Sequence, residues 1–172
     1  MHTHNPYFLE SGTVDAFHVV IEIAKGSQNK YELDHETGLL FLDRVLYSSE
    51  MYPTAYGMIP STKAGDGDAV DVMLFLTNEV PPLTVVKARA IGMISMLDGG
   101  EEDNKILAVP LDDPRFLGVK ELEDIEPHIL LEITDFLTNY KRLQKKTTEI
   151  TGVHGRLIAE KEVAKHLNNF TK

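Results

Sequence analysis

Three aspartates within six residues, Asp66, Asp68 and Asp71, constrain this chain more than any other feature of its sequence. They are interleaved with glycines and lead directly into the apolar, strand-like residues 70–76. Two carboxylates ~5 Å apart repel each other by roughly 3 kcal/mol at an effective dielectric constant of about 20. The cluster therefore predicts a bound cation, and oxygen ligands favour Mg²⁺, Mn²⁺ or Ca²⁺ over zinc or copper.

The alternative interpretation of this cluster is an ordinary acidic turn, because glycine and aspartate are common turn residues. A calcium loop of the EF-hand type is excluded. Counted from Asp66, its sixth position would be Asp71 instead of glycine and its twelfth would be Thr77 instead of glutamate. The choice between a turn and a metal site depends on the rest of the chain.

The composition excludes several kinds of partner and chemistry. Acidic residues outnumber basic ones 27 to 17, and a formal net charge of -10 repels nucleic acid and anionic membranes. The absence of cysteine excludes disulfides and thiolate chemistry. The sequence has no apolar run that would span a membrane and no secretory signal at its start. We expect a cytoplasmic protein with no nucleic-acid or membrane partner.

The hydrophobic pattern predicts strands in the first part of the chain and helices in the last part. Strands are expected at residues 17–23, 31–33, 39–46, 70–76, 85–96 and 106–109. The fifth of these is long enough to bend at Gly92. One helix is expected to start at Pro127 and another to span residues 159–170. This order predicts a mainly β, α+β fold in one domain spanning residues 1–172.

A second acidic segment runs from Asp98 to Asp103 and is followed closely by Lys105. One interpretation is a solvated surface turn. The other is that Asp98 and Asp103 complete the site begun by the first cluster. Lys105 would then lie beside the metal ions, since a phosphate that bridges them still has oxygens left for an ammonium donor.

Further ionic and aromatic residues have both a structural and a functional interpretation. Lys30 and Glu32 share one side of a strand, which is usual for a surface ion pair. Arg44 interrupts an apolar run, so its guanidinium needs an anionic partner, either a carboxylate or a phosphate. Tyr52 and Tyr56 suit aromatic packing, or hydroxyl contacts with phosphate or water.

Near the end of the first predicted helix, packing alone explains Tyr140, and the helix dipole favours Lys141. The seven histidines show no ligand spacing, and we expect them to be structural or surface residues.

Together these segments resemble the soluble inorganic pyrophosphatases of the first family, in their compact prokaryotic form. Five dispersed segments match in order: VVIEIAKGSQNKYELD, LDRVLYSSEMYPTAYGMIP, AGDGDAVDVMLF, MLDGGEEDNKILAVP and LTNYKRL. They span about residues 14–145 and include the signature D-x-D-[P/E]-apolar-D, with Ala69 where proline is commonest. Beyond Lys145 the match fades, which leaves the C-terminal packing and assembly contacts open.

The resemblance implies hydrolysis of pyrophosphate to two phosphates by a closed five-stranded OB-like barrel with flanking C-terminal helices. It implies several Mg²⁺ ions per site, with Mn²⁺ or Zn²⁺ as substitutes and Ca²⁺ as an inhibitor, and a homo-oligomer, usually a hexamer. The implied metal ligands are Asp66, Asp71, Asp98, Asp103 and Glu32. The implied substrate-binding residues are Lys30, Arg44, Tyr56, Lys105, Tyr140 and Lys141. Asp68 matches the general base, with Tyr56 near the attacking water, and Glu22 and Tyr52 match supporting positions behind them.

Two hypotheses from other classes compete with hydrolysis. A non-catalytic polyphosphate- or nucleotide-binding barrel is expected to have lost the base or a shared metal ligand, yet Asp68 and Asp71 are both present. An acidic calcium-binding domain gives no reason for cationic residues to accompany the carboxylates. Pyrophosphate hydrolysis is therefore favoured.

Overall fold

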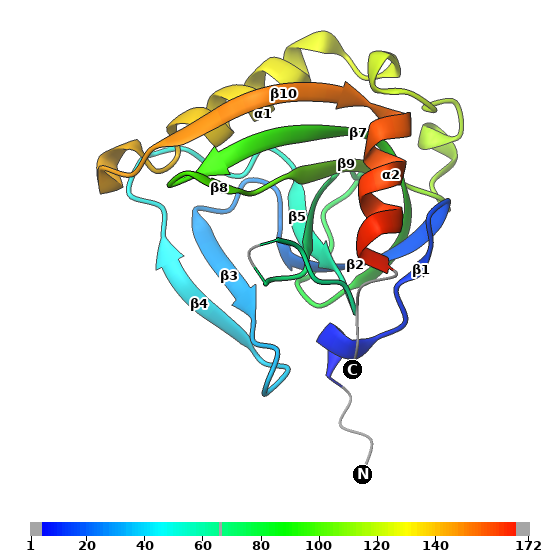
Figure 1. Cartoon of the computed structure of the whole chain (residues 1–172), viewed down its shortest axis with the longest axis horizontal. Helices are drawn as coiled ribbons and strands as arrows, with labels where there is room; N and C mark the ends of the chain where they lie inside the picture. Colours follow the sequence, from blue (N-terminus) through cyan, green and yellow to red (C-terminus); the bar gives the residue numbers. More distant parts are fainter. Residues whose placement is uncertain (1–4, 66, 168–172) are drawn as a thin grey trace.

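The fold is built on a ring of five strands, which closes because one strand pairs with two partners. In the computed structural model (Figure 1), β2 (Ala16–Ile23) pairs with β5 (Ala55–Ile59) and also with β7 (Val85–Asp98). Between these partners, β6 (Val70–Leu74) pairs with β5, and β9 (Lys105–Pro110) pairs with β6 and β7. The ring confirms the mainly β, α+β class and is consistent with the OB-like barrel that the resemblance implies.

The structure describes residues 5–65 and 67–167, and further strands extend or flank the ring. β1 (Gly12–Thr13) pairs with β2, while β8 (Glu101–Glu102) and β10 (Thr148–Gly155) both pair with β7. A separate hairpin of β3 (Asn29–Leu33) and β4 (Leu40–Val45) stands beside the ring (Figure 1). This hairpin forms one wall of the cavity described below.

The register of strand pairing in the ring sets the positions of the acidic and basic residues of the site. The β6–β9 pair is parallel, and it sets Asp71 opposite Lys105. The other pairs of the ring are antiparallel. The long strand β7 shifts register between Ala90 and Gly92, which confirms the expected bend. A Cβ on Gly92 would lie 2.8 Å from the carbonyl oxygen of His154, so only glycine allows β10 to approach this closely.

Two α-helices in the described residues cover the ring. α1 (Pro127–Asn139) starts at the expected proline, and the Glu126 side chain accepts hydrogen bonds from two backbone N–H groups of its first turn. Ile133 of α1 is fully buried in the core. α2 (Arg156–Leu167) starts earlier than expected, and its predicted continuation over residues 168–170 lies outside the described residues. Neither helix has the length and apolar composition needed to cross a membrane.

Short 3-10 helices complete the described elements: η1 (Pro6–Phe8), η2 (Pro114–Phe116), η3 (Leu122–Asp124) and η4 (Arg142–Gln144).

The sequence pattern missed the two-residue strands β1 and β8 and two longer strands, β5 and β10. β5 contains alanine and glycine, which are poor strand formers. Its Gly57 is needed because an added Cβ would lie 2.1 Å from the carbonyl oxygen of Val20 on β2. β10 alternates between intermediate and exposed positions and has no buried side chain, so its apolar signal is weak. It also follows α1, so the strands do not all precede the helices.

The strand expected at residues 39–46 is present as β4, but most of its apolar side chains lie outside the core. Phe41, Leu42 and Val45 are each about half exposed. The hairpin contributes Lys30, Glu32 and Phe41 to the cavity wall, whereas Leu42 and Val45 do not line the cavity.

Candidate active site

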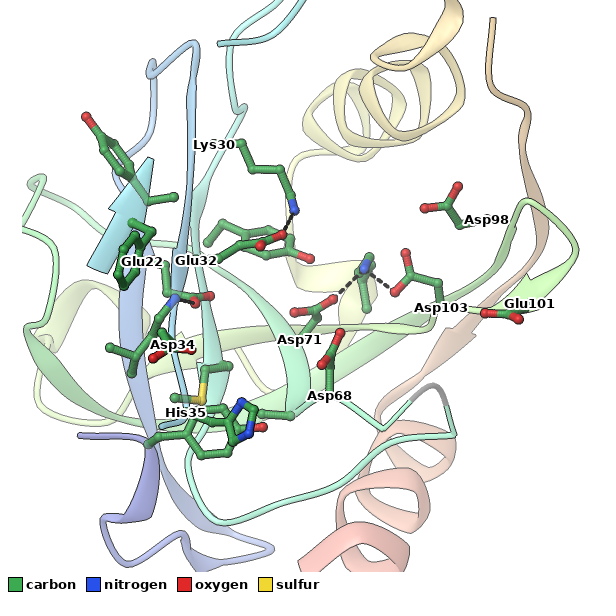
Figure 2. Close-up of a pocket in the computed structure, with 18 of the residues that line it drawn as sticks. Glu22, Lys30, Glu32, Asp34, His35, Asp68, Asp71, Asp98, Glu101 and Asp103 are labelled. Atoms are coloured by element: carbon green, nitrogen blue, oxygen red, sulfur yellow. Dashed lines mark hydrogen bonds and ion pairs between the residues drawn. The ribbon is translucent and has the colours of Figure 1, made fainter. Parts of the chain in front are cut away.

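A cavity of about 580 Å³ lies between the strand ring, the β3–β4 hairpin and the segment that follows α1 (Figure 2). Both signs of charge line it. The acidic side chains are Glu22, Glu32, Asp34, Asp68, Asp71, Asp98, Glu101, Glu102 and Asp103. The basic ones are Lys30, Lys105 and Lys141. The structure thus gathers both acidic segments and the scattered lysines into one cavity, although they lie far apart in the sequence.

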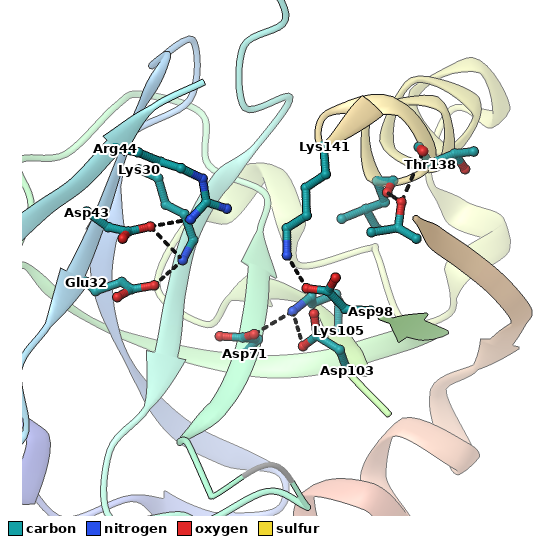
Figure 3. A network of polar contacts seen from close by, with 12 residues as sticks. Lys30, Glu32, Asp43, Arg44, Asp71, Asp98, Asp103, Lys105, Thr138 and Lys141 are labelled. Atoms are coloured by element: carbon teal, nitrogen blue, oxygen red, sulfur yellow. Dashed lines mark hydrogen bonds and ion pairs between the residues drawn. The ribbon is translucent and has the colours of Figure 1, made fainter. Parts of the chain in front are cut away.

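Across the cavity from the hairpin, one ammonium holds two carboxylates. Lys105 Nζ donates to Asp71 Oδ2 at 2.5 Å and also to Asp103 Oδ1 (Figure 3). Only 3% of Lys105 is exposed. Burial opposes its charge, but Asp71 and Asp103 outweigh burial and raise the pKa of Lys105 above its ordinary value. Lys105 is therefore a fixed cation between the two acidic segments.

A second ion pair closes the cavity on the α1 side. Lys141 Nζ donates to Asp98, which ends β7 (Figure 3). Tyr140, expected within the helix, caps its C-terminus instead, with its N–H donating to the carbonyl of Phe136. This cap directs the Lys141 side chain back across the sheet toward Asp98.

The opposite wall comes from the hairpin. Lys30 Nζ donates to Glu32, which confirms that the two side chains share one side of β3, and it lies 3.5 Å from Asp43 Oδ2. Arg44 also donates to Asp43. Its anionic partner is thus a carboxylate, and its side chain is 23% exposed rather than fully buried. Figure 3 shows these cations facing Lys105 and Lys141.

Arg44 keeps unused donor capacity. Its Nε is buried and has no hydrogen-bond partner among the described residues. Arg44 and Tyr52 are not in the cavity wall. Electrostatic coupling of Arg44 to the Tyr52 and Tyr140 hydroxyls nevertheless places its charge near the same site.

Glu22 ties the hairpin to the ring. It lies on β2, is 8% exposed, and its Oε1 accepts a hydrogen bond of 2.7 Å from the N–H of Leu33 on β3. Burial is the main cause that raises the pKa of Glu22 to about 8; the Leu33 hydrogen bond lowers it and the nearby Asp71 raises it further. Glu22 therefore supports the position of the hairpin wall, in line with its expected supporting role.

Tyr52 and Tyr140 pack against Phe136 of α1, and Tyr56 packs against Tyr52. The ring centroids of Tyr52 and Tyr56 are 5.5 Å apart, those of Tyr52 and Phe136 4.9 Å, and those of Phe136 and Tyr140 5.0 Å. Burial raises the pKa of all three tyrosines well above the ordinary value. The packing and the functional interpretation are thus compatible, because the hydroxyls stay protonated and can donate hydrogen bonds.

Asp68 lines the cavity as an exposed carboxylate, and its backbone carbonyl accepts a hydrogen bond of 2.7 Å from the N–H of Ala64. Asp66, the first expected metal ligand, lies outside the described residues. In the part of the chain that the structure describes, no three acidic or histidine side chains are grouped closely enough to hold an ion. Asp71, Asp98 and Asp103 instead hold ammonium groups.

The donor set nevertheless fits a hard divalent cation. All the acidic groups of the cavity offer carboxylate oxygens, which such ions prefer. Asp71 and Asp103 already converge on one positive charge. Two carboxylates that share a cation in this way are placed to share a metal ion at the same point.

The sequence pattern missed several residues of the cavity and its surroundings. Asp34 and His35 line the cavity from the hairpin turn, and Asp43 pairs with Lys30 and Arg44. Residues 34–38 have the composition of an ordinary turn, which does not indicate that Asp34 and His35 line a cavity. His166, expected to be structural or at the surface, is buried next to the segment that carries Asp68, which is a structural position.

Comparison with known proteins gives one consistent result. The inorganic pyrophosphatase family profile matches residues 19–171, which extends past the point where the recognisable segments fade. An inorganic pyrophosphatase of Nostoc sp. is 52% identical over 78% of this chain and 79% of its own length. One of Picrophilus torridus is 40% identical over 92% and 89%. The crystal structure of the Thermus thermophilus inorganic pyrophosphatase superposes with a TM-score of 0.93, at 35% identity, over 96% of this chain and 98% of that one.

The raised pKa of Glu22 predicts a pH-dependent contribution to stability. Between its ordinary value of 4.5 and its folded value of about 8, the folded chain holds a proton that the unfolded chain releases. This contribution is complete at low pH and is lost as the pH rises through the folded pKa. Glu22→Gln removes the titration and keeps an acceptor for the Leu33 N–H.

We expect the free energy of unfolding of the metal-free wild type, relative to Glu22→Gln, to fall by up to ~1.4 kcal/mol per pH unit between about pH 5 and 8. Urea denaturation at several pH values measures this difference. Parallel pH profiles for the two proteins would show that Glu22 is not protonated in the folded state.

Proposed function

The chain belongs to the inorganic pyrophosphatase family, and on this basis we propose that it hydrolyses pyrophosphate to two orthophosphates in the cavity described above. The observation that carries the proposal is the facing arrangement of charges. Lys30 on one wall and Lys105 and Lys141 on the other line the same cavity as the carboxylates. A cavity lined by both lysines and carboxylates is suited to a small, highly charged anion that binds together with metal cations.

The family implies a divalent metal cofactor, and we propose Mg²⁺. Asp71, Asp98 and Asp103 would hold the ions, with Glu32 contributing from the hairpin; Asp66 is a ligand by resemblance alone. Bound ions of this kind supply a more acidic water and positive charge that neutralises phosphate oxygens. Mn²⁺ or Zn²⁺ as substitutes and Ca²⁺ as an inhibitor are part of the same proposal.

The chain's own residues would bind and orient the substrate. Lys30, Arg44 and Lys141 place positive charge where the leaving phosphate gains negative charge, and such charge stabilisation dominates phosphoryl transfer. The unpartnered Nε of Arg44 supports this role. The protonated hydroxyls of Tyr56 and Tyr140 would donate hydrogen bonds to phosphate oxygens.

Asp68 would act as the general base. Its side chain is exposed and lines the cavity, so a water in the cavity can reach the carboxylate and give up a proton to it. Tyr56, packed beside Lys105 at 5.6 Å from the ammonium to the ring centroid, would hold that water through its hydroxyl. Glu22 and Tyr52 would support these groups from behind.

The two competing functions have less support. A binding protein without chemistry would have no need for an exposed carboxylate at Asp68 in addition to the carboxylates held by lysines. A calcium-binding domain would not explain why lysines line both walls of the cavity. Hydrolysis uses both sets of charges.

The proposal also covers the oligomeric state of the protein and its cellular location. We propose a homo-oligomer, a hexamer by resemblance, formed from a single domain of residues 1–172 in the cytoplasm. The half-exposed apolar side chains of Leu42 and Val45, outside the cavity lining, support association, because exposed apolar surface often marks an interface. A second copy of the chain is the occupant that we propose for this face.

Metal dependence tests the proposed function directly. Phosphate release from pyrophosphate should be fast with Mg²⁺, should stop when a chelator removes the metal, and should return when Mg²⁺ is added back. Replacement by Ca²⁺ should suppress it. Binding of pyrophosphate without phosphate release would support the non-catalytic barrel instead, and binding of Ca²⁺ without affinity for pyrophosphate would support the acidic calcium-binding domain.

Asp68→Asn should slow turnover by about 100-fold or more while leaving metal binding intact, because it removes a proton acceptor and keeps the side-chain shape. Steady-state phosphate release and calorimetric Mg²⁺ titration measure the two effects. Asp112→Asn, an exposed aspartate outside the cavity wall, is the matched control. Normal turnover in Asp68→Asn would show that this residue is not the base.

A further inference from the structure

We propose that His166 and Glu162, in the last turns of α2, are positioning residues that hold the two acidic segments of the site at their working separation. The proposal rests on the proposed function, because it assigns these residues a role in the same reaction. Neither side chain lines the main cavity. Their effect therefore has to pass through the segments that they contact.

His166 contacts the segment that carries Asp68. It is 4% exposed; its Nδ1 lies 2.7 Å from the carbonyl oxygen of Lys63, and its Nε2 lies 2.9 Å from Glu162 Oε1. A carbonyl and a carboxylate only accept hydrogen bonds, so both ring nitrogens must donate. His166 thus joins the Lys63 backbone at one ring nitrogen to Glu162 at the other.

Glu162 is ionised in this arrangement. Burial pushes its pKa upward, but the hydrogen bond from His166 and the charges of Lys165 and His166 outweigh burial and lower the pKa of Glu162. The hydrogen bond to Glu162 satisfies the His166 ring nitrogen that faces away from Lys63, so the histidine is buried with both ring nitrogens in contact with an acceptor.

The hydrogen bond to the Lys63 carbonyl also restrains Asp68, because the adjacent residue, Ala64, is hydrogen-bonded to the Asp68 backbone. The N–H of Ala64 donates to the carbonyl of Asp68 at 2.7 Å, and the N–H of Gly67 donates to the carbonyl of Ala64 at 3.1 Å. A displacement of Lys63 would move Ala64 and therefore Asp68. Figure 2 shows α2 beneath the segment that carries Asp68.

Glu162 also contacts the second acidic segment. Its carboxylate accepts a hydrogen bond from the side chain of Asn104, which lies in the chain between Asp103 and Lys105. A small space of about 30 Å³, lined by α2 and both acidic segments, separates these elements. One turn of α2 thus contacts the segment of the proposed base and the segment of a proposed metal ligand.

This arrangement predicts a loss of turnover with little change in substrate affinity. Lys30 and Lys141, which would bind the phosphates, lie on elements that α2 does not hold through these bonds. His166→Ala should lower kcat at saturating Mg²⁺ by about 10-fold or more and change KM for pyrophosphate less than about 2-fold. In hydrogen exchange, the amides of Ala64 and Gly67 should lose protection.

Val163→Ala is the matched control. Val163 lies on the same helix, is fully buried, and packs in the core without contacting either acidic segment through a hydrogen bond. It should destabilise the protein and leave kcat unchanged. His166→Gln, whose amide can donate to the Lys63 carbonyl, should recover part of the lost kcat, and it replaces His166→Ala if that variant does not fold.

The outcomes separate this proposal from the proposed function. If the wild type releases no phosphate, the proposed function fails, while hydrogen exchange at Ala64 and Gly67 still tests the contact. Unchanged exchange and kcat in His166→Ala would overturn the proposal. An equal loss of kcat in Val163→Ala at the same loss of stability would also overturn it, since the effect would then be general weakening of α2.

Discussion

The sharing of one buried ammonium by two carboxylates is the interaction on which the site depends. Asp71 and Asp103 would repel each other at the separation that a metal site needs, and Lys105 offsets that repulsion between them. The lysine cannot withdraw easily, because burial and both carboxylates fix it in place. The fold thus holds these two acidic groups close together around one positive charge.

Strand pairing makes this sharing possible. The parallel β6–β9 pair sets Asp71 opposite Lys105, and Asp103 precedes β9 by two residues. β7 runs alongside β9 and brings Asp98 to the same end of the sheet, where Lys141 reaches it from the end of α1. The hairpin completes the cavity because Glu22 ties it to the ring. A closed ring is well suited to this task, because each strand is fixed on both sides.

Much of this fold and site follows from the sequence, and the failures have physical causes. Strands with buried alternating residues were predicted, and so was the helix that starts at Pro127. β5 and β10 were missed since close backbone contact at Gly57 and exposure along β10 leave little apolar pattern. The strand at β4 was predicted, but the exposure of its apolar side chains was not, because the sequence does not show that this hairpin stands apart from the ring.

The site residues, too, were predicted in part from the sequence. Dispersed motifs identified Asp71, Asp98 and Asp103, and the structure brings them into one cavity, although no local spacing shows that they pair with lysines. The His166 contact joins residues 103 positions apart, so no local pattern could have revealed it.

Equilibrium binding of Mg²⁺ to chelator-treated protein, followed by calorimetry in the absence of substrate, tests the central claim most directly. If the carboxylates form a metal cage, the wild type should bind Mg²⁺ saturably, and Asp71→Asn should bind it much more weakly. A protein that does not bind Mg²⁺, or an Asp71→Asn variant that binds it as well as the wild type does, would contradict the claim.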